Sequence, residues 1–258
     1  MNDPFPPSRN SDPRTRDVRF QPTQWTLVLR AREQGNEREA KSAIEMLCQA
    51  YWYPLYAFAR KQGFSPHDAQ DVTQGFFAYL LEKDLFAAAN RNLGKLRTFL
   101  LTAFTRFISR ERAHERAAKR GGGRIVESLD QEFESGERRY RLEPADHITP
   151  EQIFARSWAL SLLEVAKAEI QAKEAAAGRS EIFKVLEPFL EQNRDPGVSY
   201  ESVSSRLGMS QEAVRKAVSR LRERYRDAVR DQIANTLRAP TDEEIESEMR
   251  SLRAALSR

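Results

Sequence analysis

The sequence contains few residues that could bind a metal or form a disulfide. A single cysteine, Cys48, and three histidines, His67, His114 and His147, are present among its 258 residues. One cysteine excludes a disulfide framework within the chain, and its place in an apolar run predicts a buried structural thiol. No histidine has a second His or Cys at the spacing of a zinc site. We therefore expect neither a metal nor another cofactor.

Long apolar segments and the sequence signatures of catalysis are also missing. No run of about 18 apolar residues exists, so the sequence predicts no membrane-spanning helix, and residues 1–17 lack the apolar core of a signal peptide. The Gly-Gly-Gly-Arg of 121–124 lacks the Gly-Lys-Ser/Thr ending of a phosphate-binding loop, and no serine lies in a nucleophile elbow. These absences predict a cytoplasmic protein that is not an enzyme and does not bind a membrane.

The chain has a small excess of positive charge. Its 42 Lys and Arg residues against 38 Asp and Glu give a formal net charge of +4, and its pI is near 9.2. The bias is mild over the whole chain, but many of the basic residues gather in two segments. Clustering of this kind is typical of proteins that bind nucleic acid.

Strand patterns are almost absent, and nearly every periodic segment has helical spacing. Pro and Gly stand between these segments, except Pro54, which is expected to bend or break its helix. The sequence therefore predicts an all-α protein of two helical domains joined by a linker, the second domain containing a helix-turn-helix. Helices are expected near 23–34, 37–61, 66–83, 94–118, 151–177, 180–192, 200–207, 210–236 and 242–256. The expected parts are a disordered leader with a short helix (1–38), a first domain (39–120), a linker (121–150), a second domain (151–238) and a tail helix (239–258).

Residues 198–226 have the pattern of a helix-turn-helix. Two segments with apolar stripes at helical spacing are separated by Gly208-Met209-Ser210. Gly208 can adopt the left-handed conformation that ends a helix, and Ser210 can cap the next one. The second helix has a polar, basic face that could enter a major groove, although a surface helical hairpin with a solvated face has the same pattern. The candidate DNA-binding residues on this face are Gln211, Arg215, Lys216, Ser219 and Arg220.

The helix expected from residue 66 carries apolar residues on two faces. Ser65 is a good N-cap, and Asp68 and Asp71 lie near the positive end of the helix dipole. One face belongs to the domain core, while the second, with Gln74 and Phe77, needs another surface to cover it. That surface is either a partner protein or a neighbouring segment of the same chain.

The helix expected from Gly94 is aromatic in its first half and basic in its second. Bases of single-stranded nucleic acid can stack on such rings while cationic side chains contact phosphates. The alternative is a core-facing aromatic stripe followed by a solvated helix end. The candidate DNA-binding residues here are Arg106, Arg110, Arg112, Arg116, Lys119 and Arg120.

The order of three motifs resembles the extracytoplasmic-function (ECF) sigma factors of bacterial RNA polymerase. These motifs are DAQDVTQGFFAYLLE, GKLRTFLLTAFTRFISRERAHERAAKR and YESVSSRLGMSQEAVRKAVSRLRER. The resemblance implies that the first helix binds core polymerase through Asp68, Asp71, Gln74 and Phe77. It implies that the second faces the −10 promoter element and that the last helix reads the −35 element. Two positions depart from the family pattern: Arg106 stands where an Asn is frequent, and Ala217 where an Arg is frequent.

The resemblance implies a transcription initiation factor that binds core RNA polymerase and directs it to promoters. Its expected partners are core RNA polymerase, promoter DNA and an inhibitory partner protein. A stand-alone helix-turn-helix regulator that dimerises through its N-terminal domain is the alternative. The tail carries a capping-box spacing at Thr241 and Glu244, and an apolar stripe of Ile245, Met249, Leu252 and Leu256. It is expected to pack against the C-terminal domain, or else to cover a DNA-binding or polymerase-binding surface.

Overall fold

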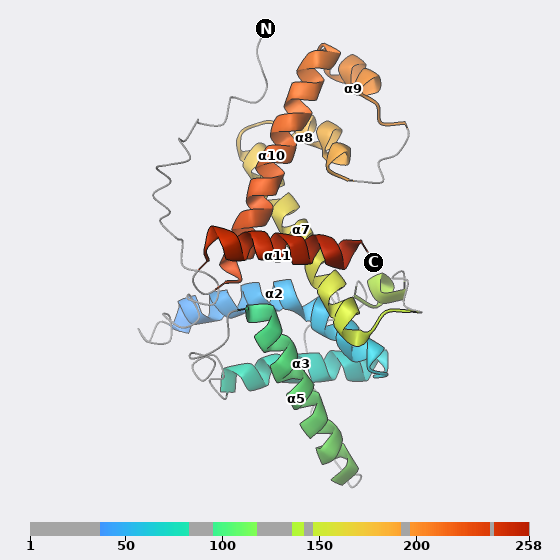
Figure 1. Cartoon of the computed structure of the whole chain (residues 1–258), viewed down its shortest axis with the longest axis vertical. Coiled ribbons are helices and arrows are strands. Elements are labelled where there is room, and N and C mark those ends of the chain that lie inside the picture. Colours follow the sequence, from blue (N-terminus) through green and yellow to red (C-terminus); the bar gives the residue numbers. More distant parts are fainter. Residues whose placement is uncertain are drawn as a thin grey trace. The chain divides into compact units, whose positions relative to one another are not determined.

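The computed structural model describes residues 37–82, 95–117, 136–141, 147–191, 197–237 and 240–257. Within these ranges the protein is all-α, and an isolated bridge between Lys95 and Leu237 is the sole β-type pairing. The predicted fold class is confirmed to this extent (Figure 1). None of the helices in these ranges is long and apolar enough to cross a membrane. The expected helix at 23–34 lies outside the described residues.

The observed helices follow the predicted ones closely. Pro54 lies inside the first of them, which continues without a break. Of the bend or break expected there, the break does not occur, because one missing N–H donor removes a single bond from a long helix whose middle is buried. The elements are α2 (Glu37–Lys61), α3 (Pro66–Glu82), α5 (Leu96–Ala117), α7 (Pro150–Ala176), α8 (Ser180–Leu186), the 3₁₀ helix η2 (Glu187–Leu190), α9 (Tyr200–Leu207), α10 (Gln211–Asn235) and α11 (Asp242–Leu256).

The chain divides into two compact units. One contains residues 163–232, and the other contains 21–162 together with 233–258. The division falls inside α7 and α10, which each contribute residues to both units, and not in the segment 121–150 that was expected to be a linker. Part of that segment, residues 136–141, is helical.

Aromatic side chains form the centre of the unit that contains α2, α3 and α5. The ring of Phe104 lies 6.0 Å from that of Phe58 and 4.9 Å from that of Phe76. All three side chains are almost completely buried. Tilted aromatic pairs at these separations add attraction beyond the burial of apolar area. The three helices are therefore joined through one aromatic cluster.

The tail helix α11 belongs to this same unit. Its predicted capping box is present, with Thr241 and Glu244 each accepting from the other's backbone N–H. Ile245 and Leu252 are buried, while Met249 and Leu256 are only partly so. Glu248, which is 1% exposed, accepts hydrogen bonds from Arg97 at 2.8 and 3.0 Å and pairs with Lys95. The tail thus contacts the start of α5, in the unit that also contains residues 233–237 of the expected second domain.

Removing residues 239–258 should lower the melting temperature by several degrees. The deletion exposes the apolar surface under Ile245 and Leu252, and about 1–3 kcal/mol of burial shifts melting by that order. Glu248→Gln should lower the melting temperature too, because it removes the charge that pairs with Arg97 and Lys95. Burial would raise the pKa of Glu248, but hydrogen bonds from Arg97 and Lys95 lower this pKa and keep the carboxyl charged. Glu243→Gln, an exposed change in the same helix, is the control for thermal unfolding. An unchanged melting temperature with raised promoter activity would instead identify the tail as an inhibitory cover.

Candidate nucleic-acid interface

The turn between α9 and α10 is built by local backbone capping. Ser199 and Ser202 cap α9 reciprocally, each side chain accepting from the other's N–H at 3.0 Å. Gly208 has φ of 63°, a left-handed conformation that favours glycine. Ser210 Oγ then accepts from the N–H of Ala213 at 3.2 Å at the start of α10. The predicted roles of Gly208 and Ser210 as helix caps are confirmed.

The two helices bury apolar side chains beneath this turn and leave a polar face outside. Val203 of α9 and the α10 residues Val214, Val218 and Leu221 are buried. Ala217 is 1% exposed, so this position lies among the core residues, and an arginine here could not reach DNA without disturbing the packing. The candidate residues Gln211, Arg215, Lys216 and Ser219 are exposed, and Arg220 is partly exposed.

The cationic side chains on this exposed face make only weak contacts with their own chain. The guanidinium of Arg215 lies 5.5 Å from the ring centroid of Tyr200. The Lys216 ammonium pairs with Glu212 at 2.8 Å, and this pair lowers the pKa of the Glu212 carboxyl. Exposed pairs of this kind contribute little to stability, because water screens the two charges. Both cations could therefore exchange these contacts for a phosphate or a base edge.

A buried carboxylate that the sequence analysis missed holds α10 in its own unit. Glu174, near the end of α7, is 0% exposed and accepts from Arg179 Nε at 2.7 Å and from Arg224 of α10. Burial would raise the pKa of Glu174, but hydrogen bonds from both arginines lower it. Tyr225 of α10 also donates to the Leu163 carbonyl at 3.2 Å. These contacts fix α10 relative to the second half of α7.

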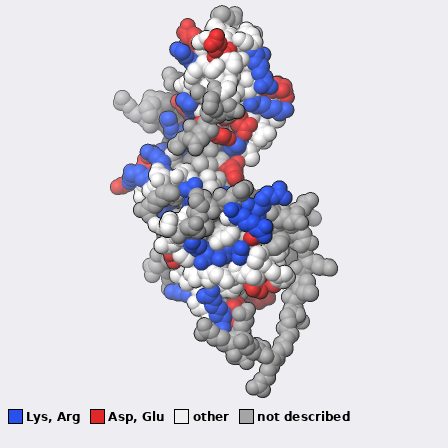
Figure 2. Space-filling model, turned by 90° about the vertical axis from the view of Figure 1, so that its right-hand side faces the viewer, with Lys and Arg blue, Asp and Glu red and all other residues white. Residues whose placement is uncertain are grey.

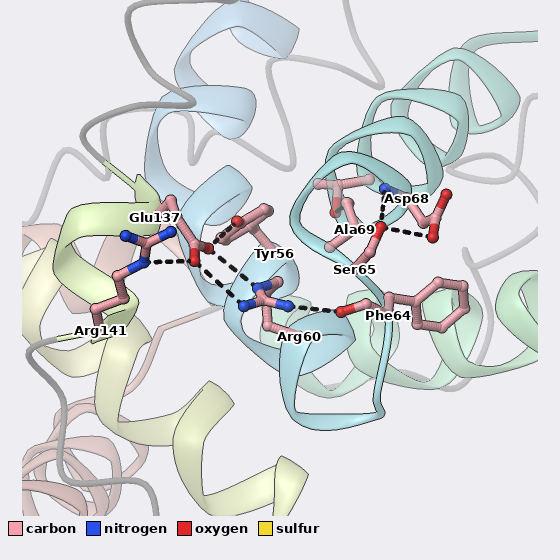
Figure 3. Close-up of polar contacts among 9 residues, drawn as sticks. Tyr56, Arg60, Phe64, Ser65, Asp68, Ala69, Glu137 and Arg141 are labelled. Carbon is pink, nitrogen blue, oxygen red and sulfur yellow. Dashed lines mark hydrogen bonds and ion pairs between the residues drawn. The ribbon is translucent and has the colours of Figure 1, made fainter.

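The candidate polymerase-binding residues of α3 are only partly at the surface. Asp68 and Asp71 are exposed and Gln74 is partly exposed. Ser65 accepts from the Asp68 N–H at 3.2 Å, which confirms it as the N-cap (Figure 3). Phe77, however, is 8% exposed, and its ring lies 6.0 Å from that of Phe76. Of the two covers expected for the second apolar face of this helix, a partner protein or a neighbouring segment of the same chain, the burial of Phe77 favours the neighbouring segment.

The arginines of α5 divide into outward and inward groups. Arg106 and Arg110 are exposed, and Arg110 lies over the Tyr79 ring at 4.3 Å and donates to its hydroxyl. Arg112 donates to the Gln62 carbonyl at 2.9 Å and lies over the Phe64 ring, so it is bound to its own unit. Arg116 is in the last turn of α5, and its side chain is outside the described part. Lys119 and Arg120 also lie outside it.

The exposed face of α5 is made of hydroxyls and arginine. Thr98, Thr102, Thr105 and Ser109 are exposed at helical spacing beside Arg106 and Arg110. The aromatic residues Phe99, Phe104 and Phe107 are buried, so these rings belong to the core and cannot stack on bases. The chemistry that this face offers is hydrogen bonding and positive charge.

Acidic side chains accompany the basic ones over the surface. The face that Figure 2 shows carries Lys and Arg in several groups with Asp and Glu among them. Within the described ranges, no group of three or more His, Cys, Asp or Glu residues could hold a metal ion.

No protein-family model, no curated protein and no solved structure matches this chain.

Proposed function

We propose that this protein is a transcription initiation factor of the ECF sigma type, which binds core RNA polymerase and recruits it to promoters. The observation that supports this most is the exposed polar face of α10, with Gln211, Arg215, Lys216 and Ser219 in its first turns. A helix that follows a tight turn and presents such residues near its N-terminus can contact base edges in a major groove. This face would read the −35 element.

A second candidate DNA surface lies on α5. The exposed Thr98 and Thr102 can donate hydrogen bonds to phosphate oxygens, whereas Thr105 and Ser109 donate to backbone carbonyls of α5. Arg106 and Arg110 add charge. We assign this face to the −10 element. Because Phe99, Phe104 and Phe107 are buried, we expect α5 to contact DNA through polar groups. The two surfaces lie on different units, as recognition of two promoter elements requires.

The alternative function, a stand-alone regulator that dimerises through its N-terminal domain, has less support. Stable dimer interfaces usually have an apolar centre. Among the side chains whose burial the structure describes, which exclude those of 37–47, Val165 is the one large apolar side chain that is exposed, at 39%, and it belongs to the other unit. The exposed residues of α3 are polar, which suits a partner with a polar surface.

Polymerase docking should depend on the exposed acidic face of α3. Asp71→Lys should weaken association with core polymerase about tenfold, which corresponds to about 1.4 kcal/mol. The fold should persist, since the Asp71 side chain is 62% exposed and its partner His67 is 79% exposed. Titration of labelled core polymerase measures the effect, with the exposed Glu82→Lys at the far end of α3 as the control. Equal affinities for the two variants would remove α3 from the interface.

A further inference from the structure

The helical segment 136–141, here called the strap, lies buried against α2. Gly136 and Glu137 are both buried. A Cβ on Gly136 would lie 2.8 Å from Cζ3 of Trp52, so only glycine fits here without a shift. Arg139 lies over the Tyr53 ring at 4.0 Å. The strap therefore covers an aromatic part of α2.

Beneath the strap, α2 presents hydrogen-bond donors in a row. Trp52, Tyr56 and Arg60 follow one another at four-residue spacing and form the donor stripe, with about 6 Å of helix rise between neighbours. The Tyr56 hydroxyl donates to Glu137 at 2.5 Å, and Arg60 donates to both its oxygens at 3.1 and 3.2 Å (Figure 3). Arg60 also donates to the Phe64 carbonyl at 2.7 Å, which fixes its guanidinium.

The strap satisfies this stripe incompletely. Trp52 is 5% exposed and its Nε1–H has no hydrogen-bond partner. A buried donor without a partner is destabilising, because it has lost its hydrogen bond to water. The Trp52 and Tyr56 rings are already stacked, with centroids 5.0 Å apart and planes 9° from parallel. The donor stripe thus contains one donor, Trp52 Nε1–H, that Glu137 does not satisfy. This donor lies beside the stacked rings of Trp52 and Tyr56.

The group that binds the donor stripe is the carboxylate of Glu137, and the residues before it in the chain are also acidic. Residues 125–137 include Asp and Glu but no Lys or Arg. An arginine fork binds a carboxylate and a phosphate in the same way. Aromatic side chains beside cationic and hydroxyl donors are the usual surface for single-stranded nucleic acid. Glu137 therefore occupies the place that a backbone phosphate could take.

We propose that the strap is a displaceable cover and that the donor stripe beneath it binds single-stranded nucleic acid. This goes beyond the proposed function, because none of the stripe residues is among those assigned to promoter DNA or polymerase. Displacement is favoured by two features. A six-residue helix is not stable by itself, and a buried ion pair contributes little net stability because its charges are desolvated.

Gly136→Leu should release the strap, because its side chain cannot fit against Trp52. We expect the variant to bind labelled oligothymidylate about tenfold more tightly than the natural protein, since a base can then stack on the exposed aromatic rings. Tyr56→Phe in this background removes one donor but keeps the ring, and should reverse most of the gain. The salt dependence should steepen on release by about 0.7 for one added phosphate contact.

The controls separate release of the strap from ligand binding. Arg138→Ala, an exposed change on the same segment, should leave affinity unchanged. Hydrogen exchange over 136–141 reports release, and Glu137→Gln provides a second release variant of nearly the same shape. Released straps with no gain in oligothymidylate affinity would overturn the proposal. If release of the strap raised the affinity for core polymerase but not for oligothymidylate, the donor stripe would bind a protein and not nucleic acid. Because α10 is unchanged and polymerase is absent from the first assay, failure here leaves the proposed function standing.

Discussion

Glu174→Ala is expected to destabilise the unit of residues 163–232 by about 2–3 kcal/mol. Removing one partner of a buried ion pair typically costs about 3–5 kcal/mol. The value here is lower because the side chains of Arg179 and Arg224 are 26% and 31% exposed, so water can solvate them in part. Hydrogen exchange of the α10 amides measures the loss directly. The variant should also bind promoter DNA less well, because α10 loses its contact with α7.

A matched control exists in the same unit. Glu181 pairs with Lys184 at 2.8 Å, but its side chain is 79% exposed, and exposed pairs contribute little to stability because water screens their charges. Glu181→Ala should therefore leave exchange nearly unchanged. Equal exchange in the two variants would show that Glu174 does not hold α10.

Acid should loosen the same unit. The folded-state pKa of Glu174 lies below the ordinary value of 4.5. A lowered pKa means that the stabilisation is complete above pH 4.5 and is lost as pH falls through the folded-state pKa. The protection of the α10 amides, after correction for the intrinsic exchange rate at each pH, should therefore fall below pH 4.5 in the natural protein, and this fall should be weaker in Glu174→Gln.

Arg215→Glu is expected to have the largest effect on promoter binding. The change removes a contact of about 1–3 kcal/mol if Arg215 pairs with a base, and it adds repulsion from phosphates. We expect a loss of roughly a hundredfold. Folding should survive, because Arg215 is exposed and its contact with Tyr200 is distant.

The comparison for Arg215→Glu is the same reversal elsewhere on α10. Arg226 is also exposed but lies in the second half of the helix. Arg226→Glu should weaken binding only slightly, through long-range charge. Affinity is measured with promoter duplex at fixed salt, and the Arg215 variant should also lose discrimination at one base pair. Similar losses in both variants would mean that α10 contributes general charge and not sequence recognition.

Local signals in the sequence predicted much of this structure. The caps at Ser65, Ser210 and Thr241 depend on hydrogen bonds between residues close in sequence, and the left-handed conformation at Gly208 depends on that glycine itself. Helical periodicity likewise located the buried stripe of α10. These features could be predicted because the residues that form them are near one another in the chain.

Contacts between distant segments could not be predicted. Glu137, Glu174 and Glu248 resemble ordinary surface carboxylates in the sequence, yet each is buried against arginines 50 or more residues away. Periodicity showed that α3 has two apolar faces but not what covers the second. Phe77 was therefore assigned to the polymerase-binding surface. Arg112 was assigned to DNA for the same reason, because charge pattern alone does not distinguish an outward arginine from one over Phe64.

Transcription by purified core RNA polymerase is the most direct test of the central claim. We predict that core enzyme with this protein produces a transcript from one class of promoter, with melting of the −10 region detected by permanganate. Core enzyme alone should do neither, and the Arg215→Glu protein should support much less of both. If the protein binds the same duplex but core polymerase neither associates with it nor melts the DNA, the chain is a stand-alone regulator and the proposed function is wrong.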